Sequence, residues 1–433
     1  MSATWITGDT LEVLRAMPSA SVDLVMTSPP FLALRSYLPD DDPAKVQEIG
    51  QESTPGEFLD VLLDITEELR RVLAPHGSIC VELGDTYAGS GGAGGDYADG
   101  GLRDGQPKFR AGTPRWDGRP DGQVRTTTSD PAEIMAVRKV GGEGWPESKS
   151  LCLIPELYRF ALAYGFNPLT GRQTPRWRIR NVIRWVRPNP PVGALGDKFR
   201  PGTSEMVIAT GCDEAGRRRY FDLDAVRATE RNPNTHARTA KGVDMRPSTG
   251  KSADNERRGG NWSTLATEHL SEKGAPPLDW WEIPTAPYKG SHYATYPPAL
   301  VERPVKAMCP LRVCTTCGEP SRRIVEHERG VDATATPHGK SGGALHSGGP
   351  MTTKFEVTRE TLGWTDCGHD TWRPGIVLDP FGGSGTTLAV ATGHGRDAIG
   401  IDLDARNADL ARERVGPMFF HEATVDELWP GAA

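Results

Sequence analysis

The 433-residue sequence lacks several features that would indicate other classes of protein. It has no run of about 18 apolar residues, so it predicts no membrane-spanning helix. Its first segment, "MSATWITGDTLEVLRAMPSA", has no basic stretch followed by an apolar core, and no secretory signal is visible. Cysteine is scarce: seven residues, an odd number and mostly scattered, argue against a disulfide framework. We therefore expect a cytoplasmic protein.

An excess of positive charge is also missing. The net charge is −7, which counts mildly against a simple nucleic-acid binder because such proteins are often basic. Two segments in the middle of the chain carry a positive charge, in contrast to the chain as a whole. Residues 172–187 hold six arginines and no acidic residue, and residues 216–258 hold eleven Lys/Arg against six Asp/Glu. Local charge matters more than the total for binding an anionic partner, so nucleic acid stays a candidate partner.

Strand and helix patterns alternate along much of the chain. Residues 4–31 predict strand, helix and strand, and residues 56–75 predict an amphipathic helix ended by Pro75 and Gly77. A strand over 78–85, a helix over 155–166 and a strand over 179–188 follow. Residues 376–415 read as strand, glycine turn, helix, strand and helix. This alternation predicts an α/β fold with a parallel sheet and helices on both faces. The regularity is lost over 86–150, which is glycine-rich, and over 213–275, which is polar.

The stretch "DLVMTSPPF", residues 23–31, ends a buried strand on two prolines. Proline terminates a strand because it lacks the N–H that a ladder needs. A hydroxyl, Ser28, stands before the prolines, and an aromatic ring, Phe31, follows them. Taken alone, the stretch fits a chance turn.

A second motif, "VLDPFGGSGTT", places Asp379 at the end of an apolar strand and three glycines in the turn that opens a helix. Glycine lets the backbone approach a ligand closely, and a helix N-terminus offers free N–H groups. Asp402 ends the next strand and can accept both hydroxyls of a ribose. An ordinary tight turn is the alternative. The motif differs from the dinucleotide-binding fingerprint. This difference disfavours NAD as the ligand and an oxidoreductase as the function.

Together the two motifs resemble those of the site-specific DNA amino-methyltransferases, in which a Ser/Asp/Asn-Pro-Pro-aromatic motif accompanies a "DPFxGSGTT" turn. The resemblance implies a Rossmann-like fold that uses S-adenosylmethionine. It covers most of residues 3–85, 151–211 and 281–415. It also implies a flipped-out base in double-stranded DNA, whose exocyclic amino group meets acceptors on Ser28 and Pro29, held by Pro30, with Phe31 stacking on the base. The implied cofactor residues are Asp9, Asp379, Phe381, Gly383, Ser384, Gly385, Thr386 and Asp402.

The order of the motifs, target motif first and cofactor turn last, is that of the circularly permuted β class of this family. It predicts that the C-terminal strands lie beside the N-terminal ones in one sheet. The expected division is a methyltransferase domain over 1–85, 151–211, 281–308 and 371–433, a glycine-rich insertion over 86–150, a target-recognition region over 212–280 and a zinc-knuckle insert over 309–370.

The "SPPF" spelling is typical of the cytosine-N4 branch, and adenine-N6 methylation is the alternative within the family. An alternative from another class is a catalytically silent DNA-binding module, which the two intact motifs oppose. A partner restriction endonuclease, and a monomeric or homodimeric state, are compatible with the resemblance.

Cysteine and histidine pairs predict a metal site. "VCTTCGEP" provides Cys314 and Cys317, and "DCGHD" provides Cys367 and His369. Two close pairs of such ligands suit a tetrahedral structural zinc, although Cys-x2-Cys alone also occurs in redox sites. Cys309 is an alternative ligand.

For DNA binding, the candidate phosphate contacts are Arg176, Arg178, Arg180 and Arg184. Trp177 and Trp185 between them fit either base stacking or core packing. His292 and Thr295 either line the methionine end of the cofactor or pack beside it.

Overall fold

The computed structural model describes the chain in segments separated by gaps. The described residues are 1–34, 37–38, 42–88, 115–116, 124–125, 142–190, 198–211, 219–227, 276–285, 295–331 and 355–431. The chain divides into two compact units. The first comprises Met1–Phe221, Asp279–Pro320 and His369–Ala433, and the second comprises Asp222–Leu278 and Ser321–Gly368.

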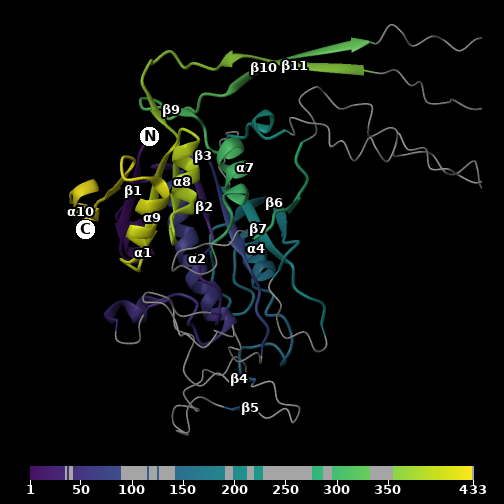
Figure 1. The fold of residues 1–433 in the computed structure, drawn as a ribbon, viewed down its shortest axis with the longest axis vertical. Helices are drawn as coiled ribbons and strands as arrows, with labels where there is room; N and C mark the ends of the chain where they lie inside the picture. The colour runs from purple at the N-terminus through teal and green to yellow at the C-terminus, as the bar shows by residue number, and fades with distance from the viewer. Residues whose placement is uncertain are drawn as a thin grey trace, which may run out of the picture. The chain divides into compact units, whose positions relative to one another are not determined.

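A nine-stranded sheet forms the centre of the first unit (Figure 1). Its spatial order is β15-β1-β14-β13-β2-β3-β7-β6-β8. These strands are β1 (Ala3–Thr7), β2 (Val22–Thr27), β3 (Leu73–Leu83), β6 (Trp177–Val186), β7 (Thr203–Gly211), β8 (Trp280–Glu282), β13 (Ile376–Asp379), β14 (Asp397–Asp402) and β15 (Phe420–Glu422).

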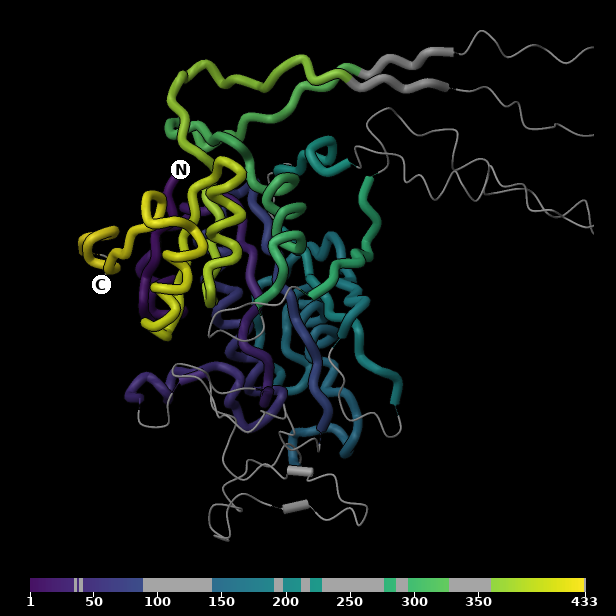
Figure 2. Tube along the Cα trace, in the orientation of Figure 1, coloured from purple at the N-terminus to yellow at the C-terminus, as the bar shows by residue number. Residues whose placement is uncertain are grey.

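The C-terminal strands insert among the N-terminal ones, as the order of the motifs predicted. β13 pairs in parallel with β2, and β14 pairs in parallel with β1. Figure 2 shows the purple start of the chain beside its yellow C-terminal segments. β13 also pairs with β14, so the two motif-bearing strands β2 and β13 are direct neighbours in the middle of the sheet.

Two sets of helices pack on the sheet. One set comprises α1 (Thr10–Ala16), α2 (Pro55–Val72) and α4 (Ile154–Tyr164), and the other comprises α7 (Pro298–Met308), α8 (Thr386–Gly393) and α9 (Asn407–Val415). Alternate side chains of a strand point to opposite faces. In β3, Ile79 and Val81 join the core beneath the first set, whereas the Cys80 thiol meets Met308 of α7. α7, α8 and α9 lie together in Figure 1.

Two sequence predictions about this sheet are wrong in detail. The sheet is not wholly parallel, because β7 runs antiparallel to both β3 and β6. The helix expected over 56–75 ends at Val72, and Pro75 and Gly77 lie inside β3. The β2–β3 register shifts between Val22 and Leu24, and this irregularity accommodates residues 74–77.

The smaller elements are short pairs of strands and helical turns. In the first unit, β9 (Arg312–Cys314) pairs with β12 (Trp372–Pro374), and β4 (Arg115–Trp116) pairs with β5 (Val124–Arg125). In the second unit, β10 (Arg323–Val331) and β11 (Phe355–Trp364) form an antiparallel pair. The remaining turns are η1 (Pro43–Gln47), η2 (Leu223–Ala225) and α10 (Val425–Leu428). Among the described residues, no helix is long and apolar enough to cross a membrane.

Most of the two loop-rich regions lies outside the described residues. Of the insertion predicted over 86–150, the structure describes 86–88, 115–116, 124–125 and 142–150. Of the recognition region predicted over 212–280, it describes 219–227 and 276–280. His292 also lies outside the described residues.

Candidate active site

The two motifs meet at one edge of the central sheet. β13, β14, β2 and β3 run in parallel, so their carboxyl ends share an edge. Asp379 ends β13, Asp402 ends β14, and Ser28 directly follows β2. In open α/β sheets, ligands bind outside the carboxyl ends of the strands. This edge is therefore the candidate active site.

Ser28 forms a close pair with an acidic side chain that the sequence analysis missed. The Ser28 hydroxyl donates to Oε2 of Glu82, near the end of β3, over 2.6 Å. Glu82 is 3% exposed, and this burial raises the pKa of its carboxyl group. Hydrogen bonds from Ser204 and Ser28 and the positive charge of Arg187 act in the opposite direction. Because Ser28 gives its hydrogen to Glu82, the lone pairs of its oxygen remain able to accept another donor.

Phe31 packs on the backbone of a glycine in the neighbouring strand connection. A Cβ atom added to Gly84 would lie 2.6 Å from Cε2 and 3.0 Å from Cδ2 of the Phe31 ring. Gly84 follows β3 directly, one position after Leu83. The absence of a side chain at Gly84 therefore leaves the space that the aromatic ring of the "SPPF" motif occupies.

Asp379 is buried, at 1% exposed, and both of its carboxylate oxygens have partners. Thr27 donates its hydroxyl to Oδ1 over 2.7 Å, and the Phe381 N–H donates to the same oxygen over 3.1 Å. The Tyr296 hydroxyl donates to Oδ2 over 2.9 Å. Burial raises the pKa of Asp379 to about 6, although these hydrogen bonds favour the charged form. The partner of Thr27 in this bond is thus 352 positions away in the sequence.

Asp402 closes the glycine turn from the next strand. Its Oδ2 accepts the Gly383 N–H over 2.7 Å, and its Oδ1 accepts from the Asp404 N–H and from the Asn407 side chain. Burial raises the pKa of Asp402 to about 6. The Gly8 N–H donates to the Asp402 carbonyl, which places the start of α1 beside it.

The remaining residues of the glycine turn have structural partners. Gly385, with φ +73°, leads into α8, and a Cβ there would lie 2.7 Å from Cβ of Ala411 in α9. The Ser384 hydroxyl donates to Oγ1 of Thr295 over 3.5 Å, and the Thr386 hydroxyl accepts from Arg414. Asp9 caps α1 by accepting the Glu12 N–H.

The predicted DNA-binding arginines lie on and beside β6. Arg178, Arg180 and Arg184 are exposed, whereas Trp177 and Trp185 are buried, so the tryptophans belong to the core. Arg184 forms an ion pair with Glu205, 2.7 Å apart. Arg176 precedes the strand, and its side chain donates to the Tyr164 carbonyl at the end of α4.

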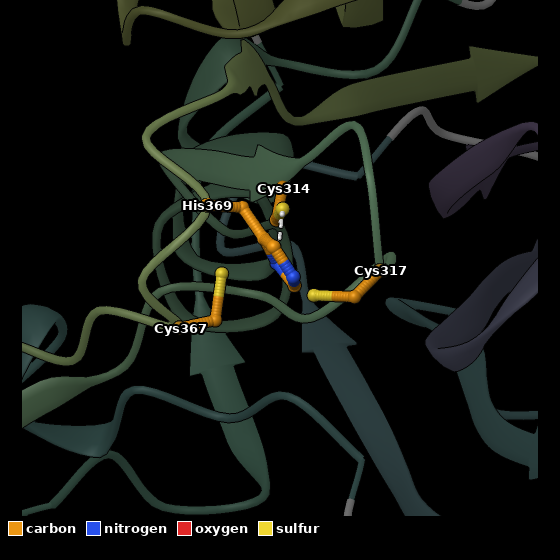
Figure 3. Close-up of side chains that lie close together, drawn as sticks. All are labelled: Cys314, Cys317, Cys367 and His369. Atoms are coloured by element: carbon orange, nitrogen blue, oxygen red, sulfur yellow. Dashed lines mark hydrogen bonds between the residues drawn. The ribbon is translucent and has the colours of Figure 1, made fainter.

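The four predicted metal ligands lie together (Figure 3). The ligand atoms of Cys314, Cys317, Cys367 and His369 are all within 4.8 Å of one another. Sγ of Cys314 lies 3.5 Å from Nδ1 of His369. Cys309, the alternative ligand, is not part of this cluster and is fully buried.

The model of the family N6_N4_Mtase, described as DNA methylase, matches residues 22–311 and 371–413. The chain belongs to this DNA methylase family. The matched residues contain the SPPF motif, Glu82, the glycine turn and Asp402. The skipped residues, 312–370, contain all four residues of the cysteine–histidine cluster. This DNA methylase therefore carries the cluster in a segment that the family model does not include.

The relatives span nearly the whole of this DNA methylase. It is 26% identical over 414 residues to the Type II methyltransferase M.Cfr9I of Citrobacter freundii, with 95% of this chain and 87% of the relative covered. It is 23% identical over 410 residues to M.SmaI of Serratia marcescens, covering 95% and 89%. The solved structure of the PvuII DNA methyltransferase (cytosine-N4-specific) aligns with 96% of this chain and 86% of that chain, at 13% identity and a TM-score of 0.46.

Three residues of this site were not predicted from the sequence. Glu82 stands in the predicted strand "SICVELGD", where an acidic residue inside an apolar run is the available signal. Gly84 stands two positions after Glu82. Tyr296 stands in "SHYATYPP", the segment that also contains His292 and Thr295.

Proposed function

We propose that this DNA methylase transfers a methyl group from S-adenosylmethionine to the N4 amino group of cytosine in double-stranded DNA. The observation that carries the proposal is the pairing of Ser28 with Glu82 at the sheet edge that also holds the glycine turn. An exocyclic amino group is a poor nucleophile because its lone pair is delocalised into the ring. Acceptors placed against its hydrogens localise that lone pair, and preorganised groups of this kind act in the transition state.

In the proposed site, the Ser28 oxygen and the Pro29 carbonyl accept the two amino hydrogens of a flipped-out cytosine. Pro30 keeps the carbonyl rigid, and the Phe31 ring, held on Gly84, stacks on the base. When the N–CH3 bond forms, positive charge develops on the amino nitrogen. Ser28 passes the proton that this nitrogen loses to Glu82, a buried carboxylate whose raised pKa suits a proton acceptor.

The chemistry of the donor and acceptor set fits S-adenosylmethionine. We assign the Asp402 carboxylate to the ribose hydroxyls, Asp9 to the adenine amino group, and the glycine turn to close backbone approach; the position of Asp402 against the turn supports this assignment. Asp379 supplies negative charge beside the turn, which suits a cationic ligand. Phe381, Ser384 and Thr386 complete the proposed cofactor site. The cofactor supplies an activated methyl group on a sulfonium centre.

We also propose that Cys314, Cys317, Cys367 and His369 bind a structural zinc ion. Three thiolates and one imidazole make a closed tetrahedral set, with about 2.3 Å expected for Zn–S and about 2.0 Å for Zn–N. Ligand atoms within 4.8 Å of one another need little movement to reach such distances. All four positions would be filled by protein, so the ion has no open position for catalysis.

The remaining assignments concern biology and specificity. The relatives named as Type II methyltransferases support a role in a restriction-modification system, with a partner endonuclease. The order of the sheet supports the circularly permuted β class.

The region over 212–280, helped by the insertion over 86–150, is proposed to read the target sequence. Exchanging 212–280 with a relative of different specificity should change the methylated site.

Incubation with methyl-labelled S-adenosylmethionine and mixed-sequence DNA, followed by nucleoside analysis, tests the proposal. Label in N4-methylcytosine is the expected result. Label in N6-methyladenine would select the adenine alternative, and no label would select the silent DNA-binding module. Ser28→Ala should bind the cofactor normally and transfer methyl about 10²–10³-fold more slowly, because one preorganised acceptor is lost. An unchanged single-turnover rate for Ser28→Ala would exclude the proposed role of the motif.

A further inference from the structure

Tyr296 belongs to neither motif, yet it contacts the strand and the helix that hold the glycine turn. It lies just before Pro297, the N-cap residue of α7. The side chain is half-buried, and its hydroxyl reaches two polar groups. It donates to Oδ2 of Asp379 over 2.9 Å and forms a short hydrogen bond with Oγ1 of Thr387 in the first turn of α8.

The residue beside Tyr296 adds a contact to the same turn. Thr295 accepts a hydrogen bond from the Ser384 hydroxyl over 3.5 Å. Two consecutive residues of the segment before α7 therefore hold the glycine turn on one side. The chain enters α7 through Pro297 and Pro298, whose restricted φ angles limit how far this segment can move.

Asp379 extends this contact to the strand that carries the target motif. Its other oxygen, Oδ1, holds the hydroxyl of Thr27, the last residue of β2. Ser28 follows directly. The Thr387 hydroxyl oxygen also lies 3.4 Å from the carbonyl oxygen of Met26, the residue before Thr27. A continuous path of hydrogen bonds leads from Tyr296 through Asp379 to the residue beside Ser28.

We propose that Tyr296 is a positioning residue for methyl transfer: by holding the Asp379 carboxylate, it keeps the cofactor turn and the "SPPF" strand in register. This inference rests on the proposed function. The cofactor side and the target side of a transfer reaction must stay aligned, since small misplacements of reacting groups cost large factors in rate. Tyr296 acts on that alignment without touching the reacting atoms.

Because of the groups around Asp379, the positioning role of Tyr296 should change how methyl transfer depends on pH. Thr27 faces it from β2, Thr387 and the Phe381 N–H face it from the α8 side, and Tyr296 faces it from the segment before α7. Glu82 of β3 is the other acid whose charge reaches Tyr296. A hydrogen bond donated to a carboxylate favours its charged form. Losing the Tyr296 hydroxyl therefore raises the pKa of Asp379 further above its usual range, and Asp379 becomes protonated at higher pH.

The test is Tyr296→Phe, which removes one oxygen and keeps the ring, with Tyr164→Phe on the exposed end of α4 as the matched control. Two quantities are measured across about pH 6 to 8.5: the single-turnover rate of methyl transfer and the affinity for S-adenosylmethionine by calorimetry. We expect the rate of Tyr296→Phe to fall roughly tenfold near pH 7, the usual effect of one hydrogen bond to a charged group. The deficit should shrink as the pH rises, and the acidic fall in cofactor affinity should move to higher pH.

Asp379→Asn supplies a second comparison. In that background, adding Tyr296→Phe should slow transfer by much less than tenfold, because the charge through which Tyr296 acts is already gone. A Tyr296→Phe enzyme with the wild-type rate and wild-type pH profile would overturn the inference. So would a loss of rate by the same factor at every pH, which indicates a general structural defect. If the wild-type chain transfers no methyl group, the proposed function fails. The effect of Tyr296 on Asp379 is still tested by calorimetry. It is overturned if cofactor affinity depends on pH in Tyr296→Phe as it does in the wild type.

Discussion

Ser28 and Glu82 come from two neighbouring parallel strands, and the 2.6 Å hydrogen bond between them joins the target motif to a buried carboxylate. The two residues are 54 positions apart in the sequence. The pair turns the hydroxyl hydrogen of Ser28 toward the protein. The oxygen lone pairs are thereby left for an incoming amino group, which is the arrangement that the proposed chemistry needs.

Glu82→Gln tests this pair. The amide has the size of the carboxylate, but it carries no charge and can donate to Ser28 instead of accepting from it. We expect the single-turnover rate of methyl transfer to fall about 10²-fold, the cost of one preorganised electrostatic partner. Glu413→Gln, on the exposed side of α9, is the matched control and should have the wild-type rate. A wild-type rate for Glu82→Gln would remove Glu82 from the chemistry.

Gly84→Ala should displace the Phe31 ring. The new Cβ would lie 2.6 Å from Cε2 of Phe31, closer than such contacts allow, so the ring must move. We expect productive capture of the flipped base to weaken, with a loss of about 1–3 kcal/mol, as for one lost stacking partner. Phe31→Ala should give a similar defect, whereas Gly211→Ala, where an added Cβ meets nothing within 4 Å, is the control. DNA binding in single-turnover titrations measures the effect, and equal affinities for Gly84→Ala and wild type would contradict it.

Asp402→Asn should weaken the binding of S-adenosylmethionine. The loss of charge-assisted hydrogen bonds predicts about 1.5–3 kcal/mol at a pH near 8. Burial raises the pKa of Asp402 to about 6, so its charge is present above that pH and lost below it. The advantage of the wild type over Asp402→Asn should therefore shrink as the pH falls through about 6. Calorimetry measures both values, with Asp409→Asn on α9 as a control, and equal affinities at high pH would exclude Asp402 from the cofactor site.

The cysteine–histidine cluster predicts a bound metal in the purified protein. We expect about one zinc ion per chain by elemental analysis. Cys314→Ser combined with Cys317→Ser should lose the ion and melt at a lower temperature, because metal-binding free energy contributes to folding. Cys152→Ala, outside the cluster, should retain the ion. Reduced protein that was never exposed to a chelator and contains no zinc would contradict the assignment.

Arg180→Ala should reduce the dependence of DNA binding on salt. Arg180 is exposed on β6. Burial lowers the pKa of the Arg219 side chain, and the nearby positive charge of Arg180 lowers it further. Two adjacent positive charges make a local site for phosphate. We expect the slope of log K against log salt to become shallower by about one. Arg15→Ala, exposed at the end of α1, should leave the slope unchanged, and an unchanged slope for Arg180→Ala would exclude a phosphate contact.

The sequence predicted those features that depend on neighbouring residues. The strand before Ser28, the turn after Asp379 and the acid at Asp402 follow from local spacing, and the structure has β2, β13 and β14 there. Local patterns also misled at one place. Pro75 predicts a helix end, yet the helix stops at Val72, since the backbone is already extended at Leu73, where β3 begins.

Apart from the neighbouring N- and C-terminal strands and the cysteine–histidine cluster, contacts between distant residues could not be predicted from one sequence. The antiparallel direction of β7 is decided by its two neighbours in the sheet and not by its own residues. Glu82 and Tyr296 were missed because their significance comes from Ser28 and Asp379, which only the folded sheet brings within hydrogen-bonding distance. The clustering of Cys314, Cys317, Cys367 and His369 was predicted because each pair has a recognisable local spacing.

The pairing of β2 with β13 also has a consequence for how the protein is made. Thr27 and Asp379 are 352 residues apart, and at about 5–20 residues per second the ribosome needs roughly 20–70 s to synthesise the chain between them. Throughout that time, the edge of β2 that will face β13 has no native partner. An unpaired apolar strand edge invites wrong pairing and aggregation. Slow cooling of the culture or added chaperones should therefore raise the yield of soluble protein, and ribosome-released fragments that end before Ile376 should aggregate.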